Sequence, residues 1–122
     1  MRFIKSISYA WQGIKYCFIS EKNFRTELII ALVAFVFAIV LKAGTNEWLA
    51  ILFCSGLVLS LEIINTSIEK LSNIVSASIH PAIKRVKDIA AGAVFLVSII
   101  SLIIAAIIFI PKIEFLIKNI FK

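Results

Sequence analysis

Two carboxylates and an amide interrupt an otherwise apolar stretch of the sequence. Glu62, Asn65 and Glu69 lie in "SLEIINTSIEKLSN" (residues 60–73), at the end of a long apolar run. An ionisable group inside a bilayer costs about 2.5–3.5 kcal/mol on insertion scales, so Glu62, the deepest of the set, is the best candidate for a functional residue. The alternative is a helix whose polar end has left the membrane. At about 100° per residue, five polar side chains share one stripe about 100° wide: Glu62, Asn65, Thr66, Glu69 and Asn73.

Carboxylates near cations suit the chemistry of phosphoryl transfer. One or two carboxylates can hold Mg²⁺ together with phosphates, and another carboxylate can accept the proton of an attacking hydroxyl. Glu62 and Glu69 are two helical turns apart, about 10.5 Å, so the deeper one could meet a lipid hydroxyl and the shallower one a metal bound to nucleotide. With His80 as the only histidine, a His-rich zinc site is excluded, and no glycine-rich nucleotide-binding motif is present.

The composition indicates what kind of scaffold positions these groups. Hydrophobic residues make up 61% of the 122 residues and charged residues 16%, against roughly 25% charged in a typical soluble domain. Apolar segments predict three transmembrane helices, at about 24–43, 47–68 and 89–110. Apolar side chains at helical spacing over about 2–19 predict an amphipathic helix on the membrane surface. The predicted fold class is therefore all-α integral membrane, with a single membrane domain over residues 1–122.

The basic residues predict how these helices are oriented. Five Lys and Arg residues precede the first apolar stretch (residues 28–41), one follows it directly, and four lie between the second and the third predicted spans. By the positive-inside rule, the N-terminus and the segment 70–88 face the cytoplasm, in a multi-pass protein of the inner (cytoplasmic) membrane. These charges bracket membrane segments and form no single stripe, which argues against a nucleic-acid partner. Pro81 is expected to open the third helix, and a basic tail is expected after Pro111.

The motif "EIINTSIEKLSN", followed by "HPAIKRVKDIAAGAV", resembles the signature of the small prokaryotic diacylglycerol kinase family, which includes the Gram-positive undecaprenol kinases. The resemblance covers residues 2–111. It implies a homotrimer of three-span subunits with active sites at subunit interfaces. It also implies an ATP-dependent lipid kinase that uses Mg²⁺ and phosphorylates the hydroxyl of diacylglycerol or undecaprenol, between which the sequence does not choose. Asn73 departs from the family pattern, which usually has Asp there.

The resemblance also implies roles for individual residues. Glu62 matches the proposed base for the lipid hydroxyl, and Asn65 matches an amide of the catalytic site. Glu21 and Glu69 match ligands of the metal that accompanies ATP. The residues expected near the nucleotide are Arg2, Tyr9, Glu21, Glu69, Ser78, Ile79, His80, Lys87 and Asp88. The residues expected near the lipid substrate are Trp11, Asn23, Phe24, Arg25, Glu27, Trp48 and Glu62.

Other interpretations of these residues stay open. Lys87 and Asp88 can also be interpreted as solvated charges at a membrane interface. Trp11 and Trp48 are typical of residues that anchor a protein at that interface. A second function class is a small oligomeric proton-coupled transporter that uses Glu62 as an intramembrane carboxylate. A third is a catalytically impaired family member, for which Asn73 is the only support.

Overall fold

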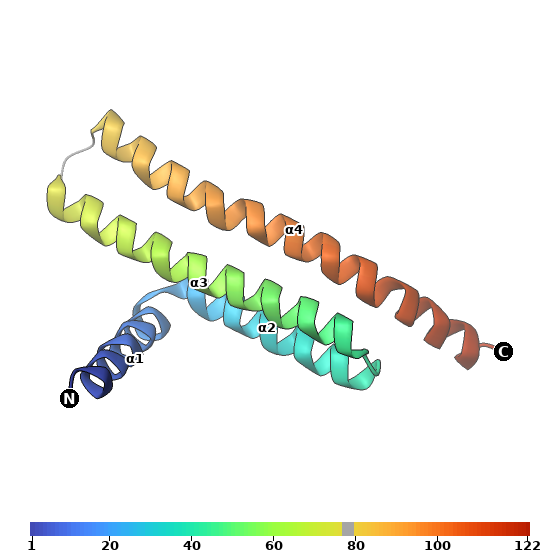
Figure 1. Cartoon of the computed structure of the whole chain (residues 1–122). Coiled ribbons are helices and arrows are strands. Elements are labelled where there is room, and N and C mark those ends of the chain that lie inside the picture. The colour runs from blue at the N-terminus through green and yellow to red at the C-terminus, as the bar shows by residue number, and fades with distance from the viewer. Residues whose placement is uncertain (77–79) are drawn as a thin grey trace.

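Four helices make up the part of the chain that the computed structural model describes, residues 1–76 and 80–122. They are α1 (Arg2–Ser20), α2 (Lys22–Val40), α3 (Thr45–Val75) and α4 (Pro81–Ile120). In Figure 1, α2 lies alongside the first part of α3, α4 runs along α3, and α1 points away from the bundle. Two residues expected near the nucleotide, Ser78 and Ile79, lie outside the described residues.

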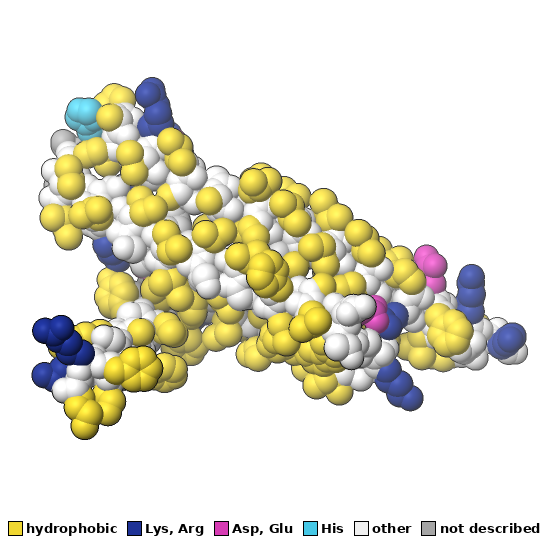
Figure 2. Space-filling model, viewed as in Figure 1, with side chains coloured by type: hydrophobic (Ala, Val, Ile, Leu, Met, Phe, Trp, Pro, Cys, Tyr) yellow, Lys and Arg dark blue, Asp and Glu magenta, His cyan; other side chains and the backbone are white. Residues whose placement is uncertain are grey.

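Three of these helices, α2, α3 and α4, are each long and apolar enough to cross a membrane. No more than 28% of the most apolar window of any of them is buried within the chain. The apolar side chains are therefore largely on the surface. Figure 2 shows them along the visible face of the bundle, with Lys and Arg gathered toward its ends. The chain is therefore a multi-pass membrane protein, and the predicted all-helical fold with three long apolar helices is confirmed. The surface position of α1 and the homotrimer stay predictions.

The last helix is longer than the sequence predicted. α4 continues through Pro111 to Ile120, so the prediction that the helix ends near residue 110 and gives way to a basic tail was wrong. A proline removes one backbone hydrogen bond and crowds one carbonyl, but residues 112–120 contain no glycine or second proline to end the helix. A contact with α3 also holds the turn after the proline, because Nζ of Lys112 lies 3.0 Å from Oε1 of Glu47.

The connection between α2 and α3 is a tight turn. α2 ends at Val40, short of the predicted boundary at residue 43, because Lys42 adopts a left-handed backbone conformation with φ of 56°. The N–H of Ala43 then donates to the carbonyl of Ala38 at 2.9 Å, a bond typical of a helix that ends in a left-handed residue. The turn therefore brings α2 and α3 together as antiparallel neighbours.

The apolar core of the bundle lies next to this turn. Ala38, Ile51, Ile108 and Phe109 form a buried cluster to which α2, α3 and α4 all contribute. Ala38 has no exposed surface, so its small side chain leaves room for the facing helices. We call this region the turn end. The opposite region, formed by α3 from Glu62 onward and the residues that contact it, is the site end.

Candidate functional site

The site end buries polar side chains in a chain that leaves most of its apolar ones exposed. Glu62, Asn65 and Thr66 of α3 are only 4%, 7% and 3% exposed. They project from one face of the helix, as the spacing of the stripe predicted. Asn73, in the last turn of the stripe, is exposed instead. The deep part of the stripe is therefore buried within the chain, and its last residue is not.

Three further carboxylates lie within electrostatic range of Glu62. Glu27 of α2, Glu69 of α3 and Glu21 at the junction of α1 and α2 all lie close enough to repel its negative charge. We call Glu21, Glu27, Glu62 and Glu69 the acidic cluster. Like charges repel more strongly away from water, so this arrangement favours the binding of a cation.

Asn65 connects the buried and the shallow parts of the cluster. Its Nδ2 donates to Oε1 of Glu69 at 3.3 Å, which orients that carboxylate. Its Oδ1 is buried and has no hydrogen-bond partner among the described residues. A buried acceptor without a donor is uncommon in proteins and is often found at a functional site. Asn65 is therefore placed to accept a bond from a group that is absent from the free chain.

Thr66 and Cys17 contribute contacts rather than reactive groups. The hydroxyl of Thr66 donates to the backbone carbonyl of Glu62 at 3.0 Å. Cys17 of α1 is 3% exposed and its thiol lies near the Thr66 side chain, so α1 rests against α3 at this point. Burial raises the pKa of the Cys17 thiol, and the negative charge of Glu21 raises it further. Cys17 therefore remains a neutral thiol at neutral pH, which does not suit a nucleophile.

Lys70 is a site residue that the sequence did not reveal. Its Nζ lies 3.7 Å from Oε1 of Glu21 and 5.7 Å from the centre of the Tyr16 ring. The signal was a lysine directly after Glu69, but a helix places adjacent residues about 100° apart, so sequence alone did not connect it to the stripe. The contact depends on how α1 and its junction with α2 lie against α3.

The start of α4 carries three more predicted residues, Lys87, Asp88 and His80, and Lys87 contacts the stripe on α3. Nζ of Lys87 donates to Oδ1 of Asn73 at 2.5 Å and so links α4 to the last turn of the stripe. Asp88 is engaged instead by Lys84, with 2.7 Å between Nζ and Oδ2. His80 is the N-cap of α4, where its Nδ1 accepts from the N–H of Ala82 at 3.2 Å. As predicted, Pro81 opens this helix.

The residues expected to contact lipid differ in how exposed they are and in what they contact. Phe24 is buried at 4% exposure, whereas Asn23 is exposed. Arg25 has a structural task that the sequence did not reveal, because its Nη1 donates to the carbonyls of Phe18 and Ile19 at 2.9 and 2.8 Å. These bonds satisfy carbonyls at the end of α1. The junction that holds Glu21 is thus fixed by an arginine cap.

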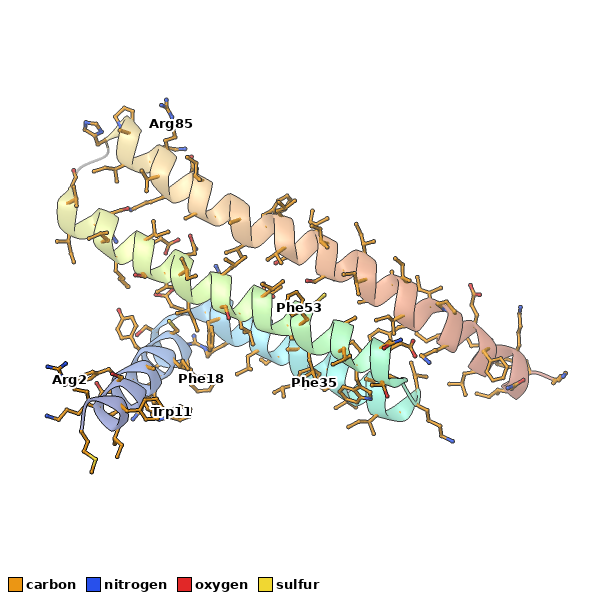
Figure 3. All side chains as sticks on the ribbon, viewed as in Figure 1. Arg2, Trp11, Phe18, Phe35, Phe53 and Arg85 are labelled. Atoms are coloured by element: carbon orange, nitrogen blue, oxygen red, sulfur yellow. The ribbon has the colours of Figure 1, made fainter. Side chains whose placement is uncertain are left out.

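Four predicted residues lie away from the acidic cluster in this chain. Trp48 packs against Phe35 at the turn end, with ring centres 6.1 Å apart. Figure 3 shows Arg2 and Trp11 on the part of α1 that projects from the bundle, and Tyr9 is 67% exposed. Arg2 is about 28 Å along the chain from Glu21 at a helical rise of about 1.5 Å per residue.

A groove of about 180 Å³ leads to the acidic cluster between α2, α3 and α4. Its walls are mainly small or apolar side chains, such as Ala31, Val58, Ser101 and Leu102. Glu27 belongs to both the groove and the cluster. An apolar chain in the groove would therefore present its polar end to the carboxylates.

The carboxylates fit a metal that also binds phosphate. Within residues 1–76 and 80–122, no three His, Cys, Asp or Glu side chains form a metal site of their own. Mg²⁺ commonly takes one or two protein carboxylates and completes its shell with water and substrate phosphates. Glu21 and Glu69 supply such oxygen ligands, and the ammonium of Lys70 already places a positive charge beside Glu21. The donor set therefore suits Mg²⁺ carried by a nucleotide.

The fold and the site together define a small multi-pass membrane protein with an acidic cluster around the buried Glu62 at one end of its bundle. The family model for prokaryotic diacylglycerol kinase matches residues 8–109, and the chain belongs to this family. The undecaprenol kinase of Bacillus subtilis (strain 168) is 36% identical over 111 residues, which cover 91% of this chain and 90% of that protein. The predicted family and the predicted class of enzyme, a kinase, are confirmed.

Two relatives named diacylglycerol kinase are similar over most of the chain. That of Escherichia coli (strain K12) is 30% identical over 102 residues, 84% of each protein. That of Synechocystis sp. (strain ATCC 27184 / PCC 6803 / Kazusa) is 33% identical over 107 residues, which are 87% of this chain and 61% of that protein. The matched segments include the whole acidic stripe of α3, as residues 8–109 of the family match do.

Proposed function

We propose that this protein is an ATP-dependent lipid kinase that transfers the γ-phosphate of ATP to the hydroxyl of a membrane lipid. The observation that carries the proposal is the burial of Glu62, at 4% exposure, inside a membrane protein of this family. A carboxylate kept away from water needs a function that offsets its cost. Acceptance of a proton from a lipid hydroxyl is such a function.

In the proposed reaction, Glu62 accepts the proton of the lipid hydroxyl as its oxygen attacks the γ-phosphorus. A new O–P bond forms, the bond from the γ-phosphorus to the bridging oxygen breaks, and ADP leaves. Asn65 orients Glu69 and offers its free Oδ1 to a donor in the site. Glu21 and Glu69 would hold Mg²⁺, which supplies charge neutralisation on the phosphates when it is bound.

The nucleotide is proposed to bind where α3 and α4 meet. Lys87 offers a positive charge to the phosphates, and its contact with Asn73 sets its position. His80 and Asp88 lie near the start of the same helix and belong to the proposed nucleotide site with Ser78 and Ile79. This end of the bundle would face the cytoplasm, where ATP is available, and the membrane would be the inner (cytoplasmic) one.

A homotrimer would bring the remaining predicted residues to the site. Arg2 and Tyr9 are exposed on α1, about 28 Å and about 18 Å along that helix from Glu21, and α1 of the same chain points away from the bundle. The apolar helices bury at most 28% of their most apolar windows within the chain, which leaves large faces for lateral association. We propose that α1 of a neighbouring subunit completes the site and that α1 lies on the membrane surface.

The lipid substrate is proposed to be undecaprenol or diacylglycerol. The relative with 36% identity, matched over 90% of its length, is named undecaprenol kinase, which favours the prenol. The diacylglycerol kinases are similar over the same helices at 30% and 33% identity. Either lipid would lay its apolar body along the groove and its hydroxyl toward Glu27 and Glu62. Assays of the two lipids side by side in mixed micelles decide between them.

The test of the kinase is transfer of labelled phosphate from ATP to these lipids. Glu62→Gln should lower turnover by about 100-fold or more, because a positioned general base typically contributes 10²–10⁴-fold. Glu114→Gln is the matched control, since Glu114 is an exposed carboxylate on the last turns of α4. Undiminished transfer by Glu62→Gln would remove Glu62 as the base. Absence of transfer to either lipid by the wild-type protein would remove the proposed substrates.

A further inference from the structure

Lys70 is the cation that the structure places at the acidic cluster. Its Nζ is 3.7 Å from Oε1 of Glu21, and the two side chains are 50% and 21% exposed. The other ion pairs found among residues 1–76 and 80–122 join Lys84 to Asp88 and Lys112 to Glu47. Within the described chain, Lys70 is therefore the cation that an ion pair connects to this cluster.

A cation near the acidic cluster would reduce the repulsion between its carboxylates. Glu21, Glu27 and Glu69 all repel the charge of Glu62. Without a metal, that repulsion acts against the packing of α2 and α3. A lysine at the mouth of the cluster reduces the repulsion while the site is empty.

The contact has the geometry of an exchangeable pair. Charge-assisted N–H···O bonds are usually about 2.7–2.9 Å long, so a separation of 3.7 Å is a loose ion pair without a strong hydrogen bond. The ammonium also lies 5.7 Å from the centre of the Tyr16 ring, within the range of a cation–π contact. The Tyr16 ring therefore gives the ammonium a second partner when it leaves Glu21.

We propose that Lys70 is a resident counterion of the metal site, which a divalent cation must displace from Glu21 in order to bind. The inference rests on the assignment of Glu21 and Glu69 as metal ligands in the proposed function. Lys70 is then a positioning residue that sets metal affinity. It stabilises the empty site and lowers the affinity of the free chain for divalent cations, because two positive charges compete for one carboxylate.

The experiment measures Mn²⁺ binding to the full-length protein in detergent, without nucleotide or lipid, from the loss of the free-ion EPR signal. Lys70→Met keeps an apolar stem of similar length but removes the charge, and should tighten Mn²⁺ binding roughly two- to fivefold, the effect of a partly exposed ion pair. Lys70→Arg keeps the charge and should bind Mn²⁺ like the wild type. Lys112→Met is the matched control, because it removes the same charge from the ion pair with Glu47 at the turn end.

A second background isolates the contact with Glu21. In Glu21→Gln protein, which binds Mn²⁺ more weakly, the further change Lys70→Met should alter the affinity by less than about twofold, because the shared carboxylate is gone. Equal effects of Lys70→Met in both backgrounds would overturn the proposal, as would an equal effect of Lys112→Met. Circular dichroism and gel filtration of each variant verify that it is folded.

The outcomes separate this inference from the proposed function. If the wild type binds Mn²⁺ and Lys70→Met binds it no more tightly, the counterion proposal is wrong and the kinase proposal is untouched. If the wild type binds no Mn²⁺ without nucleotide, the counterion proposal is wrong, because no free divalent cation competes with Lys70 for Glu21, and the kinase proposal is again untouched. Lipid phosphorylation measured on the same preparations tests the kinase independently.

Discussion

The two ends of the bundle are built in different ways. At the turn end, the buried side chains are apolar and include Ala38, Ile51 and Phe109. At the site end, the buried side chains of α3 include Glu62 and Asn65. The ion pair is also tighter at the turn end. Nζ of Lys112 lies 3.0 Å from Oε1 of Glu47 there, whereas Nζ of Lys70 lies 3.7 Å from Oε1 of Glu21 at the site end.

This difference indicates that stability and chemistry are assigned to separate regions. The turn end packs α2, α3 and α4 against one another without burying a carboxylate. The site end holds repelling carboxylates and a buried acceptor, Oδ1 of Asn65, that lacks a partner. Proteins commonly accept such local instability at functional sites when the rest of the fold compensates. The turn end therefore holds the helices that keep Glu62 in place.

The largest expected effect on activity and stability comes from replacing the buried carboxylate of the site end by an apolar side chain, as at the turn end. Glu62→Leu replaces a buried carboxylate by an apolar side chain of similar size and removes its repulsion with three neighbours. Lipid phosphorylation should fall by at least about 100-fold, because the proposed base is lost. The free energy of unfolding should rise by about 1–3 kcal/mol, because replacing buried charges by apolar groups is often stabilising.

Both quantities are measured on one preparation of Glu62→Leu, activity with labelled ATP and stability by titration with SDS. A variant that is less stable than the wild type would contradict the division between the two ends, even if it were inactive. Glu62→Gln is the comparison variant, since it removes the base and keeps a polar group in the same place.

The second largest effect should come from the opposite end. Ala38→Leu adds volume where the side chain has no exposed surface, so it should lower the free energy of unfolding by about 1–3 kcal/mol. Turnover per folded molecule should stay within about twofold of the wild type, since the acidic cluster lies at the other end of the helices. The control is Ala43→Leu, at a partly buried position of the same turn. A selective loss of turnover without a loss of stability would show that the two ends are coupled.

A smaller effect is expected where α3 meets α4. Asn73→Asp would give Lys87 a carboxylate partner in place of the amide that it now contacts. The stronger pair competes with phosphate for the ammonium, so KM for Mg-ATP should rise roughly two- to fivefold while kcat changes little. Asn73→Ala, which removes the contact without adding charge, is the control. A strong rise in turnover in Asn73→Asp would instead support the interpretation of an impaired family member.

The sequence predicts the features that depend on period and length. Apolar segments long enough to cross a membrane predicted α2, α3 and α4, and a helical period placed Glu62, Asn65 and Thr66 on one buried face. The motif around the stripe also predicted the family, which the match over residues 8–109 confirms. These features are local in the chain, so a single sequence contains the information for them.

Features that depend on how helices meet were not predictable. The arginine cap formed by Arg25 requires the angle between α1 and α2, and the contact of Lys70 with Glu21 requires the position of that junction against α3. The continuation of α4 through Pro111 was missed for a similar reason. Local rules end a helix near a proline, whereas the contact of Lys112 with Glu47 joins residues far apart in the chain.

The smallest expected effect separates two roles of one residue at the turn end. Oε1 of Glu47 accepts from the N–H of Gly44 at 3.0 Å, as in a capping box, and also pairs with Lys112. Glu47→Gln keeps an oxygen for the cap and loses the charge, so it should lower the free energy of unfolding by about 0.2–1 kcal/mol. Glu47→Ala loses both contacts and should cost about 0.5–2 kcal/mol more, the usual worth of an N-terminal cap.

Lys112→Met completes this comparison, because it removes the ion pair and leaves the cap in place. Its effect on unfolding should match that of Glu47→Gln, and lipid phosphorylation should be unchanged in both variants. If Glu47→Gln and Glu47→Ala are equally destabilised, the cap contributes nothing and the ion pair alone joins α3 to the extended part of α4. If any of these variants loses activity while it remains folded, the turn end takes part in the chemistry, and the separation between the two ends is wrong.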